Sequence, residues 1–406
     1  MFNVVMGLVV FVATSPSGSD EPGPKTSQEQ YVTLLNEHDA AWNAFLKAND
    51  EAKTDADLAA LNAMPGRNPR LYADRFMALA RSNPGSVVAE DSLVWVASHV
   101  IFGRETEEAK RLLVRDHVQS SKLARVFAFQ ILSVGSEATE LLYRESISKN
   151  PHRDVQAMAH YWLARFLVDK AETSRQWKRG SPTSVSLAPV VVEGWGADVV
   201  DRLKRLDPQV LDAEAEGEFE RVVREYSEIP HNDKLRPPGT LGTVAASYLH
   251  GLRDLTVGKA APETEGDDLD GQRFRLSDYR GKVVVLNFGS HFNCGTCREM
   301  YPHERALVKK LEGQPFALVT IDADVALDDL RAAWKAEGNL WRCVWDRSWD
   351  GPINTAWNIQ VNPTIYILDH QGVIRYKAAG DPGPELDRVV IELLAERKKP
   401  GGEDEK

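Results

Sequence analysis

The chain has 406 residues, of which 43% are hydrophobic and 27% charged, and its formal net charge is -11. This composition excludes collagen-like, coiled-coil and intrinsically disordered chains, and the length allows two or three domains of roughly 150 residues. The negative charge argues against nucleic acid or an anionic membrane surface as a partner.

A short apolar run, Val4 to Ala13, opens the chain and is followed by a stretch rich in Ser, Pro and Gly. Its ten residues are too few to cross a bilayer as a helix, which takes about 20. They have the length of a signal-peptide core, although no Lys or Arg precedes Lys25. We expect residues 1–27 to be a signal-like segment and linker, and any membrane contact to be made through this segment. The alternative is a frayed N-terminus without a targeting role.

Residues 28–255 are predicted to form an all-helical domain. Apolar residues recur there at helical spacing, as in the stripe along 152–167, and Asn-Pro or Gly interrupts the pattern. A Val- and Pro-rich stretch at 183–195 is expected to be a loop. The histidines of this half lack the spacing of metal ligands, and nothing in it indicates catalysis.

Two segments of this half resemble each other, 83–97 and 150–164. Both open with Asn-Pro, and Trp95 and Trp162 occupy equivalent positions at an offset of 67 residues. The offset is close to two helix-pair units of about 34 residues, the period of tetratricopeptide-type solenoids. The pattern predicts a concave protein-binding surface, and a plain helical bundle with similar helix starts is the alternative.

Beyond residue 255, strand and helix patterns alternate. Continuous apolar runs predict strands buried on both faces at 282–288, 316–321 and 364–368. Helical patterns separate or follow these strands at 297–311, 326–337, 352–358 and 384–396. This order indicates an α/β layer domain over 256–396. The last residues, 397–406, are charged at most positions and are expected to be a solvated tail.

The three cysteines all lie in this second part, and two of them form a C-x-x-C pair at a predicted strand-to-helix junction. Cys294 is expected at the helix N-terminus, where free N–H groups and the helix dipole stabilise a thiolate. Cys297 follows one turn later, close enough for a ring disulfide. Since the thiolate is the nucleophile of disulfide exchange, the pair predicts redox chemistry. A structural or accidental pair is the alternative.

Further motifs around this pair occur in a set order. Pro302 lies five residues beyond Cys297, and Asn362-Pro363-Thr364 opens a later predicted strand. The stretches G-K-A-A-P, D-L-D-G-Q-R-F-R-L-S-D-Y-R-G-K-V-V-V-L-N-F and P-T-I-Y-I-L-D-H-Q-G-V-I-R-Y follow one another between residues 257 and 394. This third of the chain resembles the TlpA/ResA-like thiol-disulfide oxidoreductases of the thioredoxin superfamily, which are AhpC/TSA-like redoxins. The resemblance does not extend to 28–255.

The resemblance implies a thioredoxin-like fold, an extracytoplasmic location, most simply the periplasm, and roles for single residues. Cys294 would be the attacking thiolate, Cys297 the resolving thiol, and Pro363 the cis-proline that leaves the preceding backbone open to substrate. Four further residues are candidate modulators of the pair: His291, Asp267, Thr296 and Thr364. The sequence departs from the family where Asn293 and Gly289 stand in place of tryptophans.

Two more residues carry competing interpretations. Cys343 lies in Trp-Arg-Cys-Val-Trp, which alternates as a strand does, so a buried core position is favoured over a third redox thiol. His291 forms H-x-x-C-x-x-C with the cysteine pair, three ligands that would suit Zn or Cu(I). With no fourth ligand visible, we expect neither a metal nor a cofactor.

The leading hypothesis is an exported thiol-disulfide oxidoreductase that exchanges disulfides with protein thiols, is served by an upstream thiol-disulfide donor, and recruits partners through its helical domain. A thioredoxin-fold peroxidase is a second hypothesis. It would require Pro and Thr or Ser before the attacking cysteine, and His291 stands three residues before Cys294. A third hypothesis is a helical scaffold with a degenerate redox domain, and a fourth is a metal-binding protein.

Overall fold

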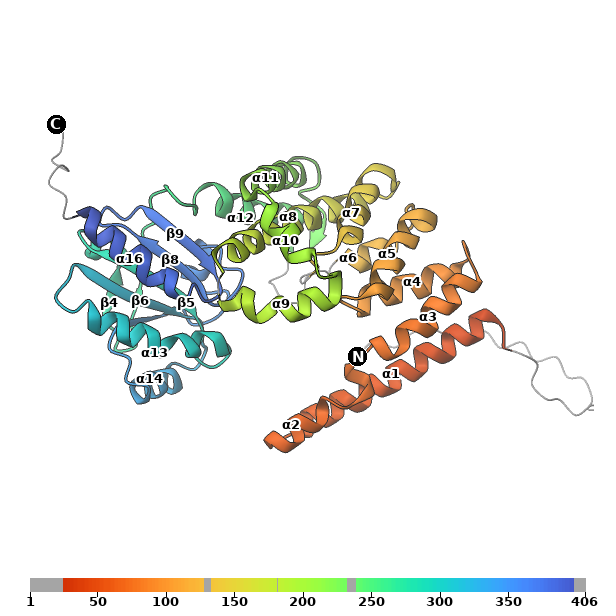
Figure 1. Cartoon of the computed structure of the whole chain (residues 1–406), viewed down its shortest axis with the longest axis horizontal. Helices are drawn as coiled ribbons and strands as arrows, with labels where there is room; N and C mark the ends of the chain where they lie inside the picture. Colours follow the sequence, from red (N-terminus) through yellow and green to blue (C-terminus); the bar gives the residue numbers. More distant parts are fainter. Residues whose placement is uncertain (1–24, 128–132, 181, 232–238, 398–406) are drawn as a thin grey trace, which may run out of the picture. The chain divides into compact units, whose positions relative to one another are not determined.

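The computed structural model describes residues 25–127, 133–180, 182–231 and 239–397 (Figure 1). Most of the signal-like segment expected at 1–27 and nearly all of the expected charged tail lie outside the described residues. Among the described helices, none is both long and apolar enough to cross a membrane. The chain divides into two compact units, Met1–Ala89 and Glu90–Lys406.

The first unit consists of helices built on α1. Its elements are α1 (Ser27–Glu51), α2 (Asp55–Leu61), the 3-10 turn η1 (Pro65–Arg67), α3 (Arg70–Ser82) and the start of α4 (Val87–His99). A capping box opens α1, in which the Thr26 side chain accepts from the Glu29 amide and the Glu29 carboxylate accepts from the Thr26 amide. Gly66 lies so close to α1 that a Cβ there would be 2.1 Å from the carbonyl oxygen of Ala41.

The second unit begins with helices that continue the all-helical pattern. They are α5 (Arg104–His117), α6 (Leu123–Phe127), α7 (Glu137–Lys149), α8 (Arg153–Arg179), α9 (Pro182–Trp195), α10 (Val199–Arg205), α11 (Pro208–Glu225) and α12 (Leu241–Arg253). A two-stranded ribbon, β1 (Pro230–His231) and β2 (Gly239–Thr240), precedes α12. The 27-residue α8 buries residues along its whole length, and it ends where Gly180 adopts the left-handed conformation that glycine favours. The prediction of a helical N-terminal region is therefore confirmed.

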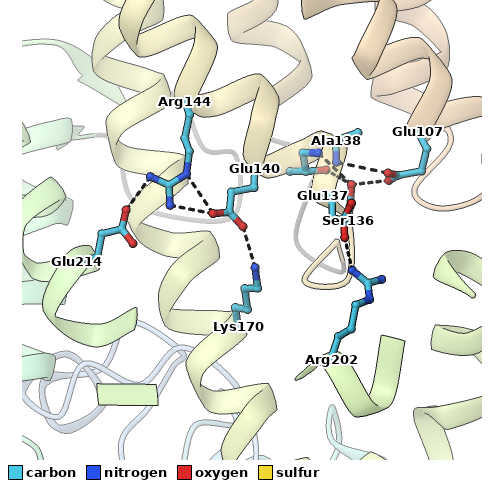
Figure 2. Close-up of polar contacts among 10 residues, drawn as sticks. Glu107, Ser136, Glu137, Ala138, Glu140, Arg144, Lys170, Arg202 and Glu214 are labelled. Atoms are coloured by element: carbon cyan, nitrogen blue, oxygen red, sulfur yellow. Dashed lines mark hydrogen bonds and ion pairs between the residues drawn. The ribbon is translucent and has the colours of Figure 1, made fainter. Parts of the chain in front are cut away.

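Ion pairs tie α7 to its neighbours (Figure 2). Glu140 accepts from Arg144 on the same helix at 2.8 Å and from Lys170 on α8 at 2.7 Å. Arg144 reaches on to Glu214 on α11 at 2.6 Å, so one chain of alternating charges joins three helices. An exposed ion pair contributes little alone, and the Glu140–Lys170 pair is the least exposed of the three.

The expectation of a loop at 183–195 is wrong, because this stretch forms α9 with Pro189 in its interior. Trp195 and neighbouring apolar residues of α9 pack against a small core of Trp177, Val199 and Leu203. Burial of this apolar face outweighs the cost of an interior proline, which local sequence patterns alone do not reveal. The segments of the proposed repeat begin α4 and α8, of 13 and 27 residues, and the tetratricopeptide arrangement stays a prediction.

A five-stranded mixed sheet forms the centre of the rest of the unit, in the order β7-β6-β5-β8-β9. Its strands are β5 (Val283–Gly289), β6 (Phe316–Asp322), β7 (Arg342–Trp345), β8 (Thr364–Leu368) and β9 (Ile374–Ala379). Strands β5, β6 and β7 run parallel, whereas β8 and β9 are antiparallel to their neighbours. The ends of β5, β6 and β7 and the start of β8 therefore meet at one edge. The predicted α/β domain with its buried strands is confirmed.

Successive residues of the strands enter two separate cores. Val283 and Val285 face the core covered by three helices, α13 (Gly295–Lys310), α14 (Leu327–Ala336) and α16 (Pro384–Arg397). Val284 and Leu286 face the other core. That core is covered by α15 (Pro352–Ala356), the 3-10 turn η2 (Leu276–Tyr279) and the ribbon β3 (Glu265–Asp267) with β4 (Arg273–Arg275). Covered on both faces, β5 is buried at every residue.

Trp357 anchors this second core, where it is fully buried. Its ring packs on Phe288 and Tyr366 at centroid distances of 5.3 and 4.7 Å, and its indole N–H donates to Thr264 Oγ1 at 2.8 Å. Trp357→Ala should lower the free energy of unfolding by about 3–5 kcal/mol, measured by urea titration. Trp42→Ala, at a 41% exposed position, is the control and should cost within about 0.5 kcal/mol of zero. Equal losses in the two variants would contradict the prediction.

Candidate active site

The cysteine pair lies at the N-terminus of α13. Cys294 is the N-cap residue, and the backbone N–H of Cys297 points at Cys294 Sγ with an N to S distance of 3.1 Å. The two cysteines are joined as a disulfide with their Cα atoms 5.3 Å apart. Cys294 is 7% exposed and Cys297 1%. After reduction, the same N–H and the helix dipole would favour negative charge on Cys294.

Strand register places Pro363 beside Gly289, which lies next to Cys297. Phe288 on β5 pairs with Thr364 on β8, so the next residues, Gly289 and Pro363, lie opposite each other at the active edge of the sheet. The Asn362–Pro363 peptide bond is cis. A Cβ at position 289 would lie 3.2 Å from Cys297 Sγ, so any larger residue there would press on the disulfide.

Two carboxylates at the end of β6 hold the loop that leads to Cys294. Asp324 accepts from Ser290 Oγ at 2.5 Å, from the Phe292 amide at 2.9 Å and from Asn293 Nδ2 at 2.9 Å. Asp322 accepts from the backbone N–H of His291 at 3.0 Å. These contacts cover every residue from 290 to 293, and they fix where the chain enters α13.

The pKa of Asp322 is raised to about 8, first by burial and then by the negative charge of Asp324. At neutral pH Asp322 is therefore mostly protonated, and the two side chains do not place two full charges under the loop. This pair was not predicted from the sequence. The available signal was the Asp-Ala-Asp sequence at the end of a buried strand, where carboxylates need partners.

A second buried carboxyl lies behind the cysteine pair. Asn287 on β5 donates from Nδ2 to Glu304 Oε1 on α13 at 2.7 Å, and burial raises the pKa of Glu304 to about 7. Within the described residues, Asn287 Oδ1 and Glu304 Oε2 have no hydrogen-bond partner. This group was also missed, although a lone Asn in the apolar run Val-Val-Val-Leu-Asn-Phe and a Glu two helical turns beyond Cys297 were visible signals.

The structure places the four candidate modulators differently. His291 is buried, its ring lies parallel to that of Tyr301 at 5.9 Å, and burial lowers its pKa. Thr364 is buried and donates to the Val361 carbonyl at 2.6 Å, while Thr296 is half-buried in the first turn of α13. Asp267 lies on β3, where its half-exposed carboxylate pairs with Arg273 at 3.5 Å. The carboxylates that contact the active-site loop are Asp322 and Asp324.

Cys343 is a free and buried thiol in the core next to β6. Burial, followed by the charges of Asp322 and Asp324, raises its pKa. Within the described ranges, no group of three or more His, Cys, Asp or Glu side chains could hold a metal ion.

Comparison with known proteins identifies the family. A family model described as AhpC/TSA family matches residues 257–377. The thiol-disulfide oxidoreductase ResA of Bacillus thuringiensis (strain Al Hakam) is 30% identical over 148 residues, 36% of this chain and 84% of that protein. The chain belongs to the ResA-like thiol-disulfide oxidoreductases. The resemblance inferred from the motifs is thus confirmed.

Two further proteins, one curated and one of solved structure, are similar to about a third of the chain. Thioredoxin-like protein YneN of Bacillus subtilis is 31% identical over 124 residues, 30% of this chain and 70% of that protein. The solved thioredoxin domain of a thiol-disulfide oxidoreductase from Bacteroides vulgatus is 24% identical, with a TM-score of 0.32. It covers 35% of this chain and 99% of that domain.

Glu304→Gln should change how stability depends on pH. Because the folded-state pKa of about 7 exceeds the ordinary value of 4.5, the folded protein holds this proton more tightly than the unfolded chain. The stabilisation is complete below pH 4.5 and is lost as pH rises through 7, by up to roughly 3 kcal/mol. In urea unfolding of the disulfide form, the unfolding free energy of Glu304→Gln should therefore rise relative to that of the wild type as the pH is raised from 5 to 8. The exposed Glu299→Gln is the control, and parallel profiles for Glu304→Gln and wild type would contradict the prediction.

Cys343→Ala should leave insulin-disulfide reduction within about twofold of wild type and cost about 1 kcal/mol of unfolding free energy, since the residue packs in the core. Turnover is measured by insulin turbidity and stability by urea titration. A loss of turnover as deep as that of Cys294→Ser would show that three thiols share the reaction.

Proposed function

We propose that the protein exchanges disulfides with protein partners outside the cytoplasm, with Cys294 as nucleophile and Cys297 as resolving thiol. The observation that carries the proposal is the backbone N–H of Cys297 directed at Cys294 Sγ at the N-terminus of α13. Among the residues that the structure describes, this contact is made to the Cys294 sulfur and not to the Cys297 sulfur. Cys294 is also the more exposed of the two, so a partner disulfide reaches it first.

In the reaction, the Cys294 thiolate attacks one sulfur of a partner disulfide, forms a mixed disulfide and releases the other partner sulfur as a thiolate. Cys297, deprotonated, then attacks Cys294 Sγ, the mixed disulfide breaks, and the second partner thiol leaves. The partner has gained two electrons and two protons overall, and the Cys294–Cys297 disulfide has formed. Two thiols of an upstream donor return the pair to the reduced state.

Three further residues around the cysteine pair support the exchange by holding backbone segments in position. Asp322 and Asp324 hold the loop before Cys294, and Pro363 lies opposite Gly289 beside the disulfide, where the preceding backbone can receive a partner segment. The direction of exchange follows from the potential of the pair. A reduction potential of about -270 mV indicates a reductant, and one of about -120 mV indicates an oxidant.

Export and partner recruitment belong to the same proposal. The apolar run from Val4 to Ala13 and the resemblance to extracytoplasmic oxidoreductases support a periplasmic location. The helical residues 28–255 supply surface beyond the redox domain 256–396 for binding protein partners.

Cys297→Ser should turn the protein into a trap for its partners. Without the resolving thiol, Cys294 still attacks a disulfide, but nothing within the chain releases the adduct, so the mixed disulfide accumulates. Cys294→Ser should give no adduct. The measurement is acid quenching with thiol alkylation in extracytoplasmic extract, followed by non-reducing gels and mass spectrometry. Equal trapping by both variants, or by neither, would refute the assignment of Cys294 as nucleophile.

A further inference from the structure

The helical region contacts the segment just before Pro363. On α12, Ser247 Oγ bonds to Asn358 Oδ1 at 2.7 Å, and the hydroxyl of Tyr248 donates to Gln360 Oε1 at 2.8 Å. Gly251 lies against the same segment, because a Cβ there would be 2.5 Å from Asn358 Nδ2. The chain from 358 to 360 is therefore held against α12, three residues before Pro363.

Tyr248 is itself fixed within the helical region. Its ring stacks on Phe219 of α11 at a centroid distance of 4.9 Å, and the Arg165 guanidinium of α8 lies 5.4 Å above it. A side chain anchored on two other helices thus reaches the redox domain through its hydroxyl.

The helical region also contacts the strand on the other side of Pro363. Strand β9 is an edge strand, so its outward backbone groups need partners from outside the sheet: Gly258 and Lys259 bond to Ile374 at its start, and α8 bonds to Ala379 at its end. Gln176 of α8 donates to the Ala379 carbonyl at 2.6 Å, and Glu172 accepts from the Ala379 amide at 3.4 Å. The next residue, Gly380, donates its N–H to the carbonyl of Pro363 at 2.8 Å.

We propose that α8 and α12 position the Pro363 segment of the redox site, and thereby help to determine how protein disulfides bind there. The proposal rests on the function proposed above. Only Val361 and Asn362 lie between Gln360, which α12 holds, and Pro363, which is bonded to the strand that α8 covers. A shift of either helix is therefore transmitted to the backbone that receives the partner. Gln176 and Tyr248 act through this segment and are positioning residues.

The test uses the full chain carrying Gln176→Ala and Tyr248→Phe together. Insulin serves as the protein disulfide. 5,5′-Dithiobis-(2-nitrobenzoate) serves as a small disulfide that reacts without binding along the Pro363 segment. Loss of two hydrogen bonds should raise KM for insulin about fivefold or more, with kcat and the rate with the small disulfide unchanged. In the oxidised double variant, backbone hydrogen exchange in the peptide that contains Gly380 should also be faster than in the wild type.

Matched control variants remove the same chemistry inside the helical region. Tyr226→Phe removes a hydroxyl that donates to Gln156 Oε1 at 3.4 Å, and Gln156→Ala removes an amide that donates to the Asn150 carbonyl at 2.8 Å. These controls should leave both disulfide assays and the exchange at Gly380 at wild-type values, whatever stability they cost.

Each outcome decides the matter. Equal loss with insulin and with the small disulfide, or double-variant kinetics that match the controls, would overturn the proposal. Unchanged exchange at Gly380 in the double variant would overturn it as well, without reference to activity. A wild-type protein that reacts with the small disulfide but not with insulin would instead refute the proposed function. In that case, hydrogen exchange at Gly380 in the double variant would still test whether α8 and α12 position the Pro363 segment.

Discussion

The proposed chemistry of the site depends on one backbone N–H, that of Cys297, which points at the sulfur of Cys294 because α13 begins at residue 295. The start of α13 is set by the loop from 290 to 293, and that loop is held by Asp322 and Asp324 at the end of β6. The parallel register of β5 and β6 places the two strand ends side by side. Sheet pairing therefore determines which sulfur the N–H faces, and where the proposed thiolate would be stabilised.

Burial of two carboxyl groups near the cysteine pair favours their uncharged forms. Asp322 and Glu304 both lie in apolar surroundings, and both have a raised pKa because the charged form loses its water. A neutral Asp322 leaves Asp324 as the main negative charge beside the loop. A buried carboxyl that stays protonated can fix a loop next to a thiolate with less repulsion than an ionised pair would bring.

Local periodicity was enough to predict strands β5, β6 and β8 and helices α13 to α16, because those strands are continuous apolar runs and Cys294-Gly-Thr-Cys297 begins a helix. It did not predict β3, β4 or β9, which are short or alternate in burial. It failed at 183–195, where packing of α9 on Trp177 decides the structure. It also failed to find Asp322, Asp324 and Glu304, because their partners lie 17 to 34 residues away and are brought together only by sheet register. No sequence pattern marks a contact between Gln176 and Ala379, 203 residues apart.

The contact between Gln176 and Ala379 joins the helical region to the sheet of the redox domain. The compact unit that contains the redox site begins at Glu90, so most of the helices and the sheet share one unit. An uncovered β9 would offer unpaired N–H and C=O groups to other chains, and α8 removes this hazard at the place where the strand bonds to Pro363. The hydrogen bonds that cover the sheet edge at Ala379 lie one residue before the bond from Gly380 to Pro363, so a variant that frees the edge should disturb the site as well.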